Sequence, residues 1–429
     1  VLKSRSILSR RFKLGMLVLV FIFGAAFRTE LAGKEPYLST DAYRYVWDGR
    51  VQSRHINPFR YFPRDPRLAF LREGKVFPNI NGADYERTPY PPAAEMVYLG
   101  VYLIHPLSVN AFKTAFLVFD LITILALMAV LARAGLDPAR AIVYAWHPLI
   151  IWEGAHSGHV DVVFITFLSL ALLAWAWKKP ALTGVALALA SLVKLYPALL
   201  LPVFLTSSDR FLNNGDDGSE KPDREKVSLA HVFSKAPAVV FSRTNIITLI
   251  SFVATILICY LPYLAGGSGA LVDAQGYLQE EGFVNKGGRY MLLGLLRRLG
   301  HIPTPVYIAG ALVTLAAAAL WWLAKDKLTA VDVARGCLAM VGLYLLLTTP
   351  RYPWYFCWLV PFLAFVPEIA WFYLTGATVL LYTLWFIPNE YPQVPLWLGA
   401  SLYLPTLILL ARNYHKRRER GKSLEAVTA

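Results

Sequence analysis

The chain has 429 residues, of which 56% are hydrophobic and 16% charged, and its mean hydropathy is +0.47. Soluble chains carry about 25% charged residues, so this composition excludes an ordinary soluble enzyme, and the long apolar runs predict a polytopic helical membrane protein. The formal net charge of +14 is explained better by basic loops on one membrane side and an anionic ligand than by nucleic-acid binding.

A first membrane helix is predicted over residues 14–31. The basic residues that precede it are Lys3, Arg5, Arg10, Arg11 and Lys13. Because basic flanks stay in the cytoplasm, this helix should lead outward. No small-residue cleavage site follows it, so we expect it to remain uncleaved.

Residues 33–92 are then expected to form an outer loop. The loop is too polar to span and too rich in Tyr, Trp, Phe, Pro and Arg to be a disordered linker. We expect short helices on the membrane face, one of them near residues 41–53. The apolar run over 93–106 is shorter than the roughly 20 residues of a span, so it should lie in the interface or re-enter.

The rest of the chain alternates between apolar runs and basic turns, which predicts an all-α bundle of about 12 to 13 transmembrane helices with cytoplasmic termini. The predicted division is an N-terminal catalytic module over 1–205, a flexible cytoplasmic loop over 206–243 and a C-terminal module over 244–429. The polar insert around NNGDDGSEK carries the loop prediction. A run over 141–152 should cross outward, and one over 198–205 should return.

Four polar clusters fall on the predicted outer side, within residues 41–57, 153–161, 194–197 and 349–355. Polar groups at membrane depth cost about 2.5 to 3.5 kcal/mol each on insertion scales. We therefore expect these clusters to gather around water, a substrate or one another. Arg289, in a second outer loop over 265–290, is expected to join them.

Asp41 lies just beyond the first helix and suits a general base toward a hydroxyl group. The alternative is a helix cap, because Ser39 and Thr40 precede it in an N-cap-like sequence. Asp48 follows two turns later on the same face, and an ion pair with Arg44 is the favoured alternative to ligand binding.

Several further side chains are candidates for sugar or acceptor binding. Arg44 alternatively touches lipid headgroups, and the aromatic rings alternatively sit in the interfacial belt. The spacing of His156, His159 and Asp161 also suits a divalent metal. We do not favour a metal site, and no cofactor is predicted. The candidates are Tyr43, Arg44, Trp47, Asp48, His156, His159, Asp161 and Tyr355.

Lys194 interrupts an apolar run and precedes Pro197, which suggests a broken helix whose end lines a cavity and binds an anion. Its alternative is snorkelling to the nearest surface. Arg351 offers a second fixed positive charge, with headgroup contact as its alternative. With Arg289, these residues are the predicted phosphate-binding set.

The sequence contains no P-loop, no Rossmann glycine pattern and no nucleophile elbow. A sugar donor handled by this chain must therefore itself reside in the membrane.

Several motifs resemble the GT-C superfamily of membrane glycosyltransferases, near the polyprenyl-phosphate-mannose-dependent mannosyltransferases. The resemblance covers about residues 14 to 410. The motifs are STDAYRYVWDGR over 39–50, INPF over 56–59, YPP over 90–92, HPLIIWEGAHSGHVD over 147–161, KLYP over 194–197 and PWYF over 353–356.

The resemblance implies a polyprenyl-phosphate-sugar donor, inversion at the anomeric carbon and a catalytic aspartate in the first outer loop, here Asp41. The chain departs from the DxD form of some relatives because Tyr43 stands two residues after Asp41, which weakens any metal assignment.

We therefore predict an inner-membrane glycosyltransferase that moves a hexose, mannose by resemblance, to a glycolipid, glycan or protein hydroxyl on the periplasmic or exterior side. The main rival is a polyprenyl-phosphate or glycolipid transporter without catalysis. Such folds often show related halves, and no repeat is visible here. The third hypothesis is that the chain is a structural subunit of an envelope-synthesis complex.

Overall fold

The computed structural model of the chain describes residues 2–72, 74–205, 237–264, 291–325, 329–386 and 394–428. Every regular element in these ranges is helical, and six helices are long and apolar enough to cross a membrane. The predicted all-α polytopic class is therefore confirmed. The six are α1 (Leu2–Ala32), α4 (Val109–Arg133), α11 (Arg243–Leu264), α14 (Thr304–Ala324), α15 (Ala330–Thr348) and α17 (Ile369–Ala377) continued by η8 (Thr378–Phe386).

Shorter apolar helices complete the bundle. They are α3 (Pro92–Ile104), α7 (Asp161–Ala176), α8 (Pro180–Val193) and η7 (Pro353–Leu359) with α16 (Val360–Leu363). The predicted total of about 12 to 13 transmembrane helices stays a prediction. The predicted cytoplasmic loop falls largely on residues 206–236, outside the described residues.

The segment expected to cross outward over 141–152 is not one helix. It is divided into η3 (Pro138–Ala141), α5 (Ile142–Ala145), α6 (Pro148–Ile150) and the π-helical turn η4 (Ile151–His156). Pro148 explains the break, because it has no amide hydrogen and the residue before a proline is disfavoured in helical conformation. After α8, the chain likewise continues as η5 (Tyr196–Leu200) and α9 (Leu201–Phe204).

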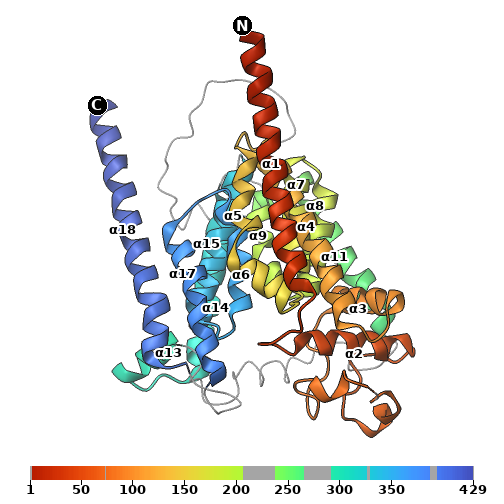
Figure 1. Cartoon of the computed structure of the whole chain (residues 1–429). Helices are drawn as coiled ribbons and strands as arrows, with labels where there is room; N and C mark the ends of the chain where they lie inside the picture. Colours follow the sequence, from red (N-terminus) through yellow and green to blue (C-terminus); the bar gives the residue numbers. More distant parts are fainter. Residues whose placement is uncertain are drawn as a thin grey trace.

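Both termini lie at one end of the bundle in Figure 1, while α2 (Asp41–Ser53) and α3 lie at the other end. The predicted short helices of the first loop are present as α2, η1 (Pro66–Leu71) and η2 (Phe77–Asn79). A further short helix, α13 (Met291–Leu299), and the start of α18 (Leu396–Thr428) share this end. The first loop and the termini are thus on opposite sides of the helices.

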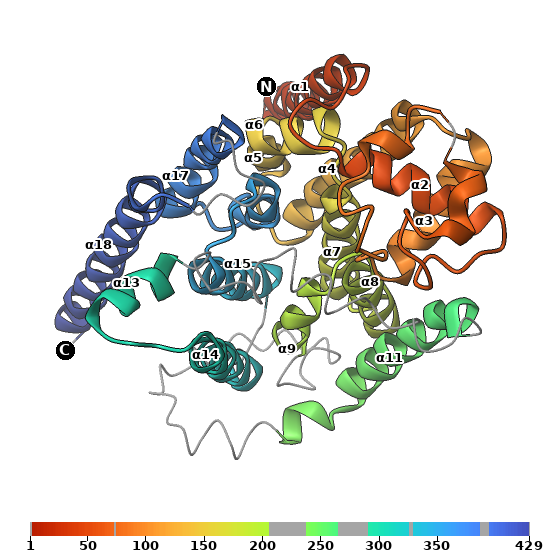
Figure 2. The same cartoon turned by 90° about the horizontal axis from the view of Figure 1, so that it is seen from below.

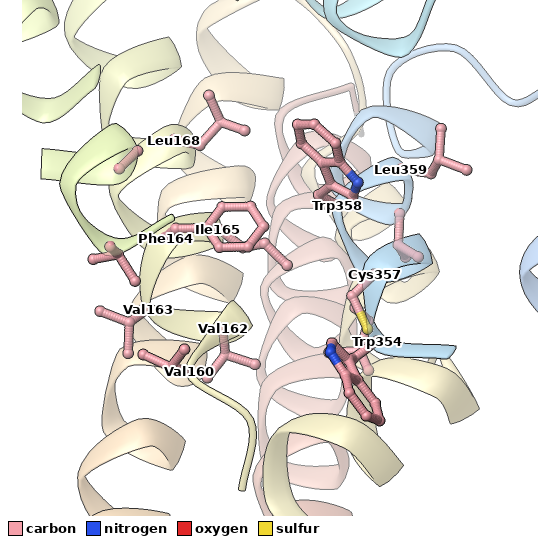
Figure 3. Packing of buried hydrophobic residues seen from close by; sticks show 14 of the residues in the cluster. Val160, Val162, Val163, Phe164, Ile165, Leu168, Trp354, Cys357, Trp358 and Leu359 are labelled. Carbon is pink, nitrogen blue, oxygen red and sulfur yellow. The ribbon is translucent and has the colours of Figure 1, made fainter. Parts of the chain in front are cut away.

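One hydrophobic core joins the two predicted modules, since it runs from Val20 in α1 to Tyr403 in α18. Viewed along the bundle, α7 and α15 lie inside the outer helices (Figure 2). Nearly every side chain of α7 is buried. Its Phe164 meets the edge of Trp358 in η7, with ring centroids 6.0 Å apart (Figure 3). This contact holds the second and fourth polar clusters close together.

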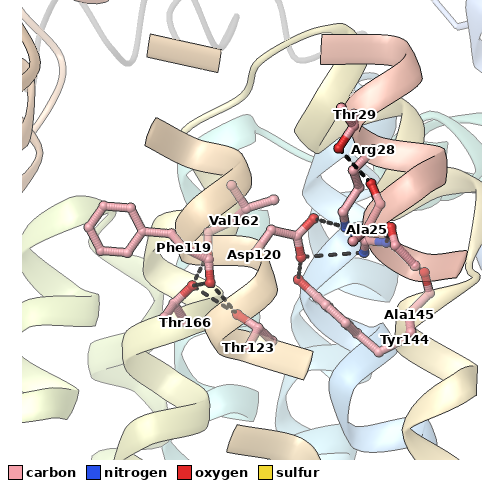
Figure 4. Close-up of polar contacts among 11 residues, drawn as sticks. Ala25, Arg28, Thr29, Phe119, Asp120, Thr123, Tyr144, Ala145, Val162 and Thr166 are labelled. Atoms are coloured by element: carbon pink, nitrogen blue, oxygen red, sulfur yellow. Dashed lines mark hydrogen bonds and ion pairs between the residues drawn. The ribbon is translucent and has the colours of Figure 1, made fainter. Parts of the chain in front are cut away.

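A buried polar clamp fastens α1 to its neighbours (Figure 4). Arg28 Nε lies 2.5 Å from Asp120 Oδ2 in α4, and Arg28 Nη1 donates to the carbonyl of Ala145 at 2.6 Å. Tyr144 OH donates to Asp120 Oδ1 at 2.6 Å. Arg28 and Asp120 are almost wholly buried and hydrogen-bonded to each other, which identifies this charge pair as a structural connection between α1, α4 and α5.

Candidate functional site

The carboxylate of Asp41 is the centre of the candidate site. Asp41 is the first residue of α2, whose N-cap Thr40 makes no side-chain capping bond. The Asp41 carboxylate instead accepts from Asn81 Nδ2 at 3.1 Å and from Tyr90 OH at 3.5 Å. Its side chain is 16% exposed, so the carboxylate is held by neighbours and still reaches solvent.

His159 connects Asp41 to two further side chains. His159 Nδ1 lies 3.5 Å from Asp41 Oδ2, and His159 Nε2 lies 3.3 Å from Glu153 Oε2. Tyr382 OH in η8 donates to Glu153 Oε1. These four side chains, Asp41, His159, Glu153 and Tyr382, form a continuous row that we call the carboxylate–histidine row.

Local backbone geometry explains why His159 is placed there. The π-helical turn η4 carries Glu153, and a turn follows in which Gly158 has φ +71°. Left-handed backbone of this kind favours glycine. The His159 amide then donates back to the Glu153 carbonyl at 2.9 Å. The ring of His159 stacks on Trp354 in η7 with centroids 3.9 Å apart.

The surroundings favour the charged forms of Asp41 and His159. Burial by itself would raise the pKa of Asp41, but the hydrogen bond and charge of His159, with the charge of Lys194, hold that pKa below its ordinary value. Burial would lower the pKa of His159, but Asp41 and Glu153 raise it above its ordinary value. Both directions favour an ionised Asp41 facing an imidazolium.

Lys194 brings the third cluster to the site. It ends α8 in extended conformation, and its Nζ lies 2.8 Å from Asp161 Oδ2 at the start of α7. The same Nζ lies 5.1 Å from the ring centroid of Tyr355. Lys194 therefore contacts the second and fourth clusters, and it is near enough to Asp41 to lower that residue's pKa.

Arg351 brings the fourth cluster. Its guanidinium carbon lies 4.5 Å from the ring centroid of Tyr352, which itself stacks on Trp354 at 4.5 Å. Since Trp354 also stacks on His159, the prediction that the four polar clusters gather is confirmed for the described residues.

The remaining predicted residues take different positions. The ion pair that was favoured for Asp48 is present, with Arg44 Nε 3.0 Å from Asp48 Oδ1 and both side chains buried. Trp47 is 1% exposed and packs on Phe77, whereas Tyr43 OH lies 3.4 Å from Glu35 Oε2 at the surface. Ligand binding by these four residues stays a prediction.

His156 lies beside the row, with its ring stacked on Trp152 at a centroid distance of 4.0 Å. Arg289 lies outside the described residues. Among the residues that are described, no three His, Cys, Asp or Glu side chains are arranged to hold a metal ion.

Five residues of the site have no predicted role from the sequence: Asn81, Tyr90, Glu153, Trp354 and Tyr382. Glu153 and Trp354 stand within motifs that were noted, and Tyr90 opens the YPP motif. Tyr382 gave no signal, because it lies in an apolar segment where a tyrosine resembles any other interfacial aromatic residue.

Residues 20–208 match a family described as alpha-(1->6)-mannopyranosyltransferase, N-terminal domain. The match includes the first three polar clusters and ends before η7 and η8. Comparison with curated proteins gives no match.

Proposed function

We propose that this chain, whose residues 20–208 match the alpha-(1->6)-mannopyranosyltransferase family, moves mannose from a polyprenyl-phosphate donor to an acceptor hydroxyl. In this proposal the transfer takes place at the outer side of the inner membrane, inverts the anomeric carbon and uses Asp41 as general base. The observation that supports it most is the partly exposed Asp41 carboxylate beside His159 and Lys194.

The acceptor reaction begins at Asp41. An acceptor hydroxyl donates to the ionised carboxylate and attacks the anomeric carbon on the face opposite the phosphate. Asp41 takes the hydroxyl proton as the new glycosidic bond forms and the bond to the phosphate oxygen breaks. A base in hydrogen-bond reach of the hydroxyl contributes typically about 10² to 10⁴-fold to such a step.

The donor phosphate is assigned to Lys194 and Arg351, with Arg289 as a third candidate. The leaving phosphate gains negative charge, so fixed cations stabilise the transition state more than the bound donor. Lys194 forms a salt bridge with Asp161. This bond holds the ammonium group in place before the phosphate arrives. His156, Asp161, Tyr43 and Tyr355 are the remaining candidates for contacts with the sugars.

The test is Asp41→Asn in purified protein supplied with polyprenyl-phosphate-mannose and a mannoside acceptor. We expect mannose transfer to fall by about 10² to 10⁴-fold, because asparagine cannot accept the proton. Asp84→Asn is the matched control, since Asp84 is in the same loop and pairs with Arg64 at the exposed surface.

Transfer retained by Asp41→Asn would remove the base assignment. A wild-type protein that moves polyprenyl phosphate between vesicle leaflets but transfers no mannose to any acceptor of a broad panel would favour the transporter instead.

A further inference from the structure

Four flat groups form a continuous series from the acceptor side of the proposed site to its donor side. The ring of His159 stacks on Trp354, with centroids 3.9 Å apart and planes 24° apart. Trp354 also stacks on Tyr352, with centroids 4.5 Å apart and planes 11° apart. The guanidinium carbon of Arg351 lies 4.5 Å from the centroid of Tyr352, whose hydroxyl accepts a hydrogen bond from Arg351. We call these four residues the aromatic stack.

Two prolines restrict the backbone that carries the stack. Arg351 and Tyr352 stand between Pro350 and Pro353, and Tyr352 is extended, with φ −97° and ψ 128°. A residue before a proline is held near this conformation, and each proline has a fixed φ. The helix η7 then starts at Pro353 and carries Trp354. The two rings and the guanidinium group are therefore attached to backbone with little freedom.

The stack is buried and supported from the side. Trp354 and Arg351 are each 7% exposed, and His159 is fully buried. Trp385 of η8 meets Tyr352 and Trp354 by its edge, with centroid distances of 6.2 and 6.5 Å. Closely packed side chains of this kind hold their neighbours in fixed positions.

The stack carries a positive charge at each end. Arg351 has a fixed guanidinium charge. Burial by itself would lower the pKa of His159, but its hydrogen bond to Asp41 and the charges of Glu153, Asp41 and Asp161 raise that pKa above its ordinary value. Aromatic faces attract cations, and tryptophan does so most strongly. The two rings therefore stabilise the charged groups that lie on them.

We propose that Trp354 is a positioning residue for the transfer reaction, because it holds His159 beside the base and, through Tyr352, Arg351 beside the donor phosphate. The inference rests on the proposed function and deepens it, since one tryptophan sets the acceptor side and the donor side relative to each other. A displacement of about 1 Å between reacting groups can cost about 10²-fold in rate, so this separation matters for the transfer step.

The test compares two substitutions of the same residue. Trp354→Leu removes both stacking contacts, whereas Trp354→Phe keeps an aromatic face. Trp371→Leu is the matched control, since Trp371 of α17 is 6% exposed and its ring lies against Gly342 of α15, outside the aromatic stack. Both leucine variants lose a buried indole, so both should lower the temperature of thermal unfolding.

Binding measures the donor end of the stack. The probes are farnesyl phosphate and farnesol, which share a hydrocarbon chain and differ in the phosphate, and the shift in thermal unfolding gives their affinities. The wild type should bind farnesyl phosphate more tightly than farnesol. Trp354→Leu should weaken binding of farnesyl phosphate by about 3- to 30-fold and leave that of farnesol within about twofold, because Arg351 loses its support. Trp354→Phe should restore most of the preference, and Trp371→Leu should keep it.

The pH profile of mannose transfer measures the acceptor end. Burial would raise the pKa of Asp41, and His159 with Lys194 lowers it below its ordinary value. Without the ring of Trp354, His159 is no longer held beside Asp41, and the pKa of that carboxyl rises. The acidic limb of kcat/KM should therefore move to higher pH in Trp354→Leu and move less in Trp354→Phe. Trp371→Leu should keep the wild-type limb.

A Trp354→Leu variant with the wild-type phosphate preference and the wild-type acidic limb would overturn the inference. Transfer lowered by one factor at every pH, with the phosphate preference kept, would also overturn it, since Trp354 would then support only the fold. Equal affinities of the wild type for farnesyl phosphate and farnesol would overturn the donor half. Retained transfer by Asp41→Asn removes the base instead and leaves the binding comparison as expected, so failure of the proposed function is distinguished from failure of this inference.

Discussion

At the scale of single residues, the site depends on how Asp41 is kept ionised. Three carboxylates surround His159: Asp41 of α2, Glu153 of η4 and Asp161 of α7. The imidazole ring also stacks on Trp354. Asp41 in turn is faced by Asn81, Tyr90, Tyr45 and Lys194 as well as by His159. In the proposed reaction His159 is thus a positioning residue, because it would act on the transfer step through Asp41.

This arrangement predicts the pH dependence of transfer. The base must be ionised, so kcat/KM should fall as the pH drops through the pKa of Asp41, which His159 and Lys194 lower. In His159→Gln the histidine charge is lost, the pKa of Asp41 rises, and the acidic limb of the pH profile should move to higher pH. His55→Gln, at an exposed position just after α2, is the control.

The pH profile distinguishes this role from a structural one. If His159→Gln lowered kcat/KM equally at every pH, the histidine would support the fold of the site without setting the protonation of Asp41.

At the scale of the elements, the position of α1 depends on a charge pair inside the bundle. Arg28 connects α1 to Asp120 in α4 and to the backbone of α5, and α5 leads through α6 to η4, which carries Glu153. The polar clamp therefore supports the segment on which one carboxylate of the carboxylate–histidine row is placed.

Arg28→Ala should lower the free energy of unfolding by about 3 to 5 kcal/mol, because it leaves Asp120 buried without its charge partner. Thermal unfolding of the detergent-purified protein measures this loss. Arg11→Ala, on an exposed position of the same helix, should change stability by less than about 0.5 kcal/mol. The double variant Arg28→Met with Asp120→Leu should recover part of the loss, since it removes both charges. If Arg28→Ala were as stable as the wild type, the polar clamp would not contribute to stability.

At the scale of the whole molecule, the two termini and the first loop lie at opposite ends of the helices (Figure 1). The basic residues before residue 14 and near the C-terminus favour a cytoplasmic position for both termini. The site at Asp41 would then open to the exterior side, where a lipid donor in the outer leaflet can reach it.

Cysteine labelling tests this orientation. Phe70 in the first loop is 61% exposed and Tyr414 in α18 is 64% exposed, while the native cysteines Cys259, Cys337 and Cys357 are buried. A membrane-impermeant maleimide should label Phe70→Cys in intact cells and Tyr414→Cys only after the membrane is opened. The reverse pattern would place the site on the cytoplasmic side.

The sequence by itself determined the features that depend on neighbouring residues. Apolar runs of membrane-spanning length identify the helical class wherever they occur. The Arg44–Asp48 pair follows from helical spacing of four residues. Because polar groups avoid lipid, the sequence also indicated which clusters gather, and the structure brings them together at Asp41.

Only the tertiary structure decided which side chains touch. Asp41 and His159 are far apart in the chain, as are Glu153 and Tyr382, and Trp47 is buried because Phe77 folds onto it. The break at Pro148 and a cavity between α5, α6 and η8 likewise arise from packing between distant segments. Such contacts depend on crossing positions and rotamers of separate helices, which local patterns of hydropathy and charge do not encode.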